Sequence, residues 1–78
     1  ADIVRLEASD DYTLVHAAGK QFLVSLPLGE FARRLPPEKF LRVHRSAVVN
    51  LDCVSEIEEF DRRLLIYMTD GAAVQASR

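Results

Sequence analysis

Apolar and polar residues alternate along most of this chain, which is the pattern of β-strands that bury one face. This alternation predicts strands over residues 3–8, 12–16, 21–26, 54–58, 64–68 and 72–76. Turn residues such as Asp11, Gly19 and Gly71 lie between these segments. Short connections of this kind join antiparallel neighbours, and the apolar strand over residues 64–68 is expected at the centre of its sheet. All four phenylalanines are expected in the core, and His16 at a half-buried or surface position.

One segment has the period of a helix instead. Apolar residues at Leu28, Phe31, Ala32 and Leu35 follow the i, i+3, i+4, i+7 spacing of one helical face. Prolines lie on both sides, so the spacing predicts a short helix over residues 28–35. A helix of this length is not stable alone and must pack on a sheet. The fold class predicted is therefore mainly β, with antiparallel sheets and one short helix.

The segment over residues 40–51 (FLRVHRSAVVNL) combines strand-forming residues with cations. His44, Arg45 and Ser46 offer hydrogen-bond donors with no carboxylate between them. Such a set suits phosphates and base edges better than bond cleavage. Asn50 is expected to tie the following turn through a bond from its side chain to the backbone.

The net charge of −2 conceals an uneven distribution. Residues 33–45 hold five cations and one anion, a local balance of +4, whereas residues 52–61 hold five anions and no cation, a balance of −5. Asymmetry of this kind can orient a protein on a polyanion. The alternative is two solvated faces of opposite sign, with Arg45 in a surface ion pair with an acid of residues 52–61.

Length and composition restrict the remaining classes. Seventy-eight residues make one domain, and no apolar run approaches the roughly 20 residues of a bilayer span. No secretory leader opens the chain, and the single Cys53, expected to be partly buried, has no cysteine to pair with. These features favour the cytoplasm.

The chain also lacks the patterns of catalytic and metal sites. His16 and His44 are the only histidines, and Cys53 has no ligand spacing with either. Neither a Gly-rich phosphate loop nor carboxylates paired near a base are present. We therefore expect no metal, no cofactor, no small-molecule substrate and no enzymatic activity.

The order of these pieces resembles the LytTR family of DNA-binding domains, the output modules of many bacterial response regulators. The resemblance covers essentially residues 1–78, and its most specific part is the FLRVHRS-x-VVNLD run that begins at Phe40. It implies an elongated antiparallel β sandwich in which loops, rather than a recognition helix, enter successive major grooves. In the family a further strand precedes the position of residue 1 and a basic segment follows that of Arg78. These residues are therefore expected to be a fragment of the domain.

The resemblance also implies which residues contact DNA. Base contacts are expected from the loop that holds Asp11 and Tyr12, from Arg45 and from Arg78. Arg42, His44 and Ser46 fall where backbone contacts or loop support are expected. Arg45 is suited to the bidentate pair with guanine, whereas Arg42 is suited to a phosphate. Asp11 is acidic, so base reading at that position requires an acceptor role toward cytosine.

The function expected from the resemblance is sequence-specific binding of double-stranded DNA by the output module of a bacterial transcriptional regulator. Family members bind paired direct repeats as dimers, and the module usually follows a receiver domain or a membrane sensor. The alternative function is a β-rich protein-interaction module that pairs through an exposed edge strand.

Overall fold

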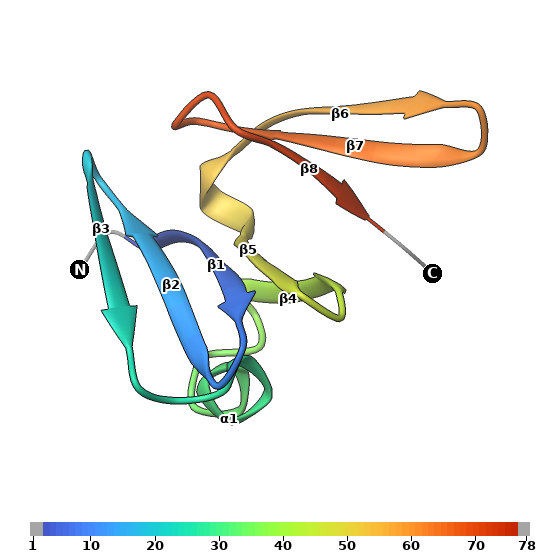
Figure 1. Cartoon of the computed structure of the whole chain (residues 1–78). Helices are drawn as coiled ribbons and strands as arrows, with labels where there is room; N and C mark the ends of the chain where they lie inside the picture. The colour runs from blue at the N-terminus through green and yellow to red at the C-terminus, as the bar shows by residue number, and fades with distance from the viewer. Residues whose placement is uncertain (1–2, 77–78) are drawn as a thin grey trace.

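The computed structural model describes residues 3–76, and these form two antiparallel sheets and one α-helix (Figure 1). The elements, in chain order, are β1 (Ile3–Ser9), β2 (Tyr12–Ala17), β3 (Lys20–Val24), α1 (Leu28–Arg33), β4 (Phe40–His44), β5 (Ala47–Asn50), the 3₁₀ turn η1 (Leu51–Cys53), β6 (Val54–Phe60), β7 (Arg63–Met68) and β8 (Ala73–Ala76). The first sheet has the order β3-β2-β1-β5-β4, and the second has the order β6-β7-β8. The molecule measures 35 × 25 × 22 Å. The predicted fold class, an elongated antiparallel sandwich with one short helix, is confirmed.

The first sheet is covered on both faces, which divides the core in two. One cluster packs the sheet against α1 and holds Leu6, Val15, Leu28 and Val48. The other lies between the two sheets and holds Val4, Val43, Val49, Ile66, Met68 and Val74. Neighbouring residues of β5 therefore face opposite clusters, because successive side chains of a strand alternate.

The helix and one strand are shorter than the sequence predicts. Helix α1 ends at Arg33, since the amide of Leu35 donates to Ala32 O at 3.2 Å in a tight last turn. Leu35 still packs against the core below the helix, as its spacing predicts. Strand β3 ends at Val24, where the amide of Leu26 donates to Val24 O at 2.8 Å and turns the chain towards α1.

Two expectations about burial are wrong. Phe22 is 50% exposed and Phe60 is 67% exposed, because each lies on an edge strand with one uncovered face. Phe31 and Phe40 pack against the core beside α1, as predicted. His16 is buried at 7% exposure rather than half-buried, because β2 is an inner strand and Glu7 Oε1 lies 3.0 Å from His16 Nε2.

Other local expectations hold. Cys53 is partly buried against the cluster between the sheets. β7 is the central strand of the second sheet, and its pairing with β6 shifts register between Val54 and Glu56. Gly19 has a φ of 70°, a conformation that favours glycine in the β2–β3 turn. Over residues 3–76, no helix has the length and apolarity to cross a membrane.

Candidate nucleic-acid interface

Two turns meet at one end of the first sheet. β1 lies between β2 and β5, and its last residues pair with the first residues of both, Ser9 with Tyr12 and Glu7 with Ala47. The amide of Ala8 donates to Ser46 O at 2.9 Å, which joins the end of β1 directly to the β4–β5 turn. The turn over residues 10–11 and the turn over residues 45–46 are thus adjacent. The structure brings together the predicted site residues of both segments, Asp11, Tyr12, Arg42, His44, Arg45 and Ser46.

The β1–β2 turn projects an acidic and an aromatic side chain. Asp10 adopts a φ of 56°, a left-handed conformation that aspartate tolerates in tight turns. Asp11 and Tyr12 are both exposed. The next residue, Thr13, is fully buried, and its Oγ1 donates to Leu26 O at 2.7 Å. Because side chains alternate along a strand, this anchor turns Tyr12 outwards.

His44 and Ser46 close the β4–β5 turn on itself. The backbone amide of Ser46 donates to His44 Nδ1 at 3.1 Å, and the Ser46 hydroxyl lies 2.7 Å from the same nitrogen. A nitrogen that accepts from an amide carries a lone pair, so the ring proton of the neutral imidazole belongs to Nε2. The histidine therefore supports the turn through Nδ1 and keeps one N–H donor for another partner.

Arg42 supports the same turn from the other face of the sheet. Its Nη2 donates to Arg45 O at 2.6 Å, and a Cβ at Gly29 of α1 would lie 3.5 Å from its Nη1. The guanidinium thus lies between the start of the helix and the turn. It has five N–H donors, so one bond to a carbonyl leaves others for a phosphate.

Arg45 itself is exposed at the tip of the turn. Within residues 3–76 it forms no ion pair, so the alternative of a salt bridge with residues 52–61 is not observed. Asp52 instead pairs with Lys39 at 3.6 Å, and Glu58 accepts from the Tyr67 hydroxyl at 3.0 Å. Arg78, the remaining predicted contact, lies outside the described residues.

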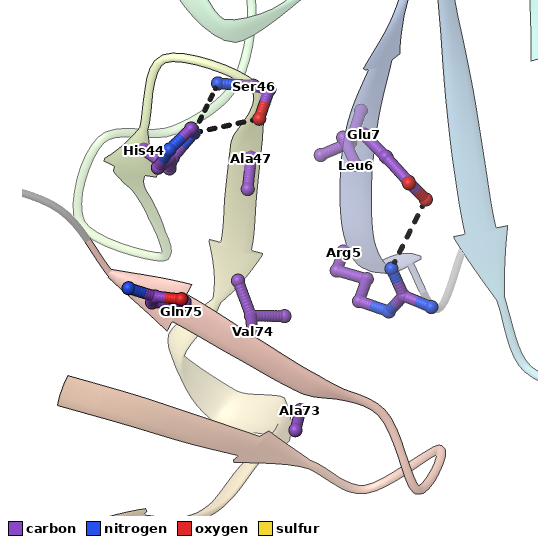
Figure 2. Close-up of a pocket in the computed structure, with 9 residues that line it drawn as sticks. All are labelled: Arg5, Leu6, Glu7, His44, Ser46, Ala47, Ala73, Val74 and Gln75. Carbon is purple, nitrogen blue, oxygen red and sulfur yellow. Dashed lines mark hydrogen bonds and ion pairs between the residues drawn. The ribbon is translucent and has the colours of Figure 1, made fainter. Parts of the chain in front are cut away.

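A cavity of about 340 Å³ opens behind the β4–β5 turn, between the first sheet and β8. Figure 2 shows His44 and Ser46 on one side of it, Arg5 and Glu7 of β1 on the other, and Gln75 of β8 along its edge. His44 is half-buried against this space. In the described part of the chain no three metal-ligating side chains come together.

Two supporting contacts were not foreseen from the sequence. Arg5 Nε donates to Asp70 Oδ2 at 3.3 Å, which joins β1 to the β7–β8 turn of the other sheet. The Asn50 side chain accepts from the Asp52 amide at 2.9 Å, as predicted, but it also donates to Ile3 O at 2.7 Å. These partners are far apart in the chain, and no local pattern indicates them.

Fold and site together define a class: a two-sheet antiparallel β domain that carries an exposed arginine and an exposed tyrosine at adjacent turns. The chain belongs to the LytTr DNA-binding domain family, whose sequence profile matches residues 1–78. This is a family of DNA-binding regulator domains and not a class of enzymes.

Individual relatives agree with this assignment. The chain is 40% identical over 72 residues to the CO-responsive transcriptional regulator RcoM of Rhodospirillum rubrum, covering 92% of the chain and 30% of that protein. It is 34% identical over 70 residues to the transcriptional regulatory protein YpdB of Escherichia coli, covering 88% of the chain and 29% of that protein. The chain thus spans just under a third of the length of these relatives.

A solved structure has the same fold. The LytTr DNA-binding domain of a protein described as a methyl-accepting/DNA response regulator from Bacillus cereus superposes with a TM-score of 0.89 at 32% identity. The match covers 97% of this chain and 71% of that one.

Proposed function

We propose that this domain binds double-stranded DNA sequence-specifically through the turns over residues 10–11 and 45–46, which enter the major groove. The observation that carries the proposal is the exposure of Arg45, whose side chain has no ion-pair partner within the described residues. The turn that carries it is held by the side chains of Arg42 and His44. The backbone of this turn is already ordered, so binding does not have to order it. The guanidinium that the turn carries is suited to the bidentate contact with guanine O6 and N7.

The neighbouring residues receive complementary roles in this proposal. Tyr12 contacts the groove beside Arg45, and Asp11 accepts a hydrogen bond from a base donor such as cytosine N4. His44 Nε2, Ser46 and the remaining donors of Arg42 face the phosphate backbone, which fixes the register without reading the sequence. Arg78 is proposed as a second base contact.

At the level of the whole protein, we propose that the domain is the output module of a bacterial transcriptional regulator. The support comes from two relatives, RcoM and YpdB. Both are transcriptional regulators, and the segment that matches this domain covers less than a third of each of those proteins. A receiver or sensor domain would supply the remainder. Two copies would then occupy paired direct repeats.

The test is selection of duplex targets from a randomised pool, followed by measurement of the affinity for the selected duplex at several salt concentrations. We expect log Kobs to fall linearly with log salt, with a slope of about −0.9 for each phosphate neutralised. The alternative function, β pairing with a protein partner, predicts no enrichment of any duplex. Failure to select a sequence together with a flat salt dependence would reject the proposal.

Arg42 provides a second test, because it donates to Arg45 O in the structure and is proposed to bind a phosphate as well. Arg42→Ala is expected to weaken binding to the selected duplex and to random DNA, and to lower the salt slope by about one phosphate. Arg42→Lys keeps the charge but cannot bridge the Arg45 carbonyl and a phosphate as a guanidinium does, so it is expected to restore the slope more fully than the affinity. If the slope of Arg42→Ala equals that of the unmodified chain, Arg42 does not contact a phosphate.

A further inference from the structure

The strand β6 is the least protected element of the molecule. Among residues 3–76 it pairs with β7 on one side only, so its outer edge presents backbone N–H and C=O groups that no described strand pairs, along its seven residues. Six of these residues are exposed, from Ser55 to Phe60. The far end of the β6–β7 hairpin extends well beyond the first sheet (Figure 1), so neither of its faces is covered there.

The edge is strongly acidic. Glu56, Glu58 and Glu59 lie within β6, and the strand contains no cation. The Tyr67 hydroxyl donates to Glu58 Oε1 at 3.0 Å. This hydrogen bond, together with the charges of Glu58 and Glu56, raises the pKa of Tyr67 above its ordinary value of 10.0. Negative charge from Glu56 and Glu58 is therefore concentrated on the face of the hairpin that carries Tyr67.

Large apolar side chains are exposed among these carboxylates. Ile57 is 60% exposed and Leu64, on β7, is 44% exposed. Ile57 pairs with the buried Ile66, and Leu64 pairs with Glu59, so both lie on the face that continues into the core between the sheets. Phe60, on the opposite face of the strand, is also exposed. Acids alone protect an edge against aggregation, but exposed apolar side chains beside them are typical of an interaction surface.

Charge decides what can occupy this edge. A second copy paired antiparallel through the same edge, with Ile57 opposite Ile57, would place Glu56 opposite Glu58 twice, and like charges directly opposite each other are destabilising. A nucleic acid would meet the same repulsion from its phosphates. A cationic polypeptide meets neither obstacle.

We propose that the β6 edge binds an extended segment of a partner protein in which lysine or arginine alternates with apolar residues. The segment adds as a further strand to the β6-β7-β8 sheet, its backbone pairing with that of β6. Its cations lie beside Glu56 and Glu58, which share one face of β6, and its apolar residues pack against Ile57 on the other face. This inference does not depend on the proposed DNA function, because the interface turns lie on the other sheet.

The probe for this inference is a synthetic peptide of alternating lysine and valine, one residue longer than β6 at each end. Isotope-labelled chain, without DNA, is titrated with the peptide, and amide chemical shifts and hydrogen exchange are followed by NMR. We expect shifts and slowed exchange confined to β6 and its neighbours. A peptide of the same composition with its lysines in one block and its valines in another is the control for simple charge attraction. We expect it to leave the exchange of β6 amides unchanged.

Two variants separate the edge from the overall charge. Glu56→Lys combined with Glu58→Lys is expected to weaken binding of the alternating peptide by about tenfold, because two opposite-charge pairs become like-charge pairs. Glu30→Lys combined with Glu38→Lys makes the same change in net charge on and after α1, away from the second sheet, and is expected to leave peptide binding unchanged.

Three outcomes would overturn the inference. The first is equal protection of β6 by the alternating and block peptides. The second is peptide binding that does not respond to the Glu56 and Glu58 changes. The third is dimerisation of the chain in sedimentation equilibrium with β6 amides already protected, which would assign the edge to a second copy. The DNA selection described above is independent of all three, so failure of one proposal is distinguishable from failure of the other.

Discussion

Arg45→Ala is expected to reduce the affinity for the selected duplex by about 1–3 kcal/mol, or roughly fivefold to more than a hundredfold. The loss for random DNA should be much smaller, because a base contact contributes to discrimination whereas phosphate contacts contribute equally to all sequences. The structural reason is that Arg45 is exposed on a supported turn and holds no acidic partner among the described residues. Its removal therefore leaves no buried charge, and the fold is retained. Competitive binding with labelled duplexes measures both affinities.

A matched variant separates the effect of the position of Arg45 from the effect of losing one positive charge. Arg63 is also exposed but lies on β7 in the second sheet, so Arg63→Ala removes the same side chain away from the proposed interface. We expect Arg63→Ala to have little effect on the ratio of the affinity for the selected duplex to the affinity for random DNA. Equal losses for both duplexes on replacing Arg45 would reassign this arginine to phosphate binding. Equal effects of the two variants would place the interface elsewhere.

Leu6→Ala is expected to lower the free energy of unfolding by about 2–5 kcal/mol. Leu6 is fully buried on β1, where it packs beneath α1 with Val15, Leu28 and Val48. The change removes apolar contacts and leaves a cavity in the inner strand that connects both interface turns. A chain of this length has a total stability on the order of 4–12 kcal/mol, so the variant loses a large share of it. Urea unfolding followed by circular dichroism measures the difference.

Leu64→Ala is the control for this prediction. It makes the same chemical change, but Leu64 is 44% exposed on the β6–β7 hairpin. Its cost is expected to stay below about 1 kcal/mol, because little apolar area returns to water. If the two variants were equally destabilising, the core below α1 would not be the main source of stability.

Much of the local structure follows from the sequence. The spacing of Leu28, Phe31, Ala32 and Leu35 predicted which face of the helix packs inwards, and all four contact the core as expected. The segment over residues 40–51 combines strand-forming residues with cations that suit a polyanion, and two of these cations, Arg42 and Arg45, are exposed. These features depend on side chains close together in the chain, whose relative positions are set by helix and strand geometry.

Burial was harder to predict for single residues. All four phenylalanines are apolar residues expected in the core, yet Phe22 and Phe60 are exposed, whereas Phe31 and Phe40 pack inwards. The edge position alone does not decide burial, because Phe40 also lies on an edge strand, β4. Its side chain packs against the cluster beside α1, whereas those of Phe22 and Phe60 are largely open to solvent.

The order of residues along the chain was enough to predict the strands, the inward face of the helix and the cationic turn with His44, Arg45 and Ser46. Three features came from the packing of distant segments: this turn lies beside the Asp11 and Tyr12 turn, Arg42 and His44 support it, and Arg5 joins the two sheets through Asp70. Periodicity could not predict them, because it reports contacts within one element. Strand order and the pairing of distant side chains arise from the packing of the whole chain around its two apolar clusters.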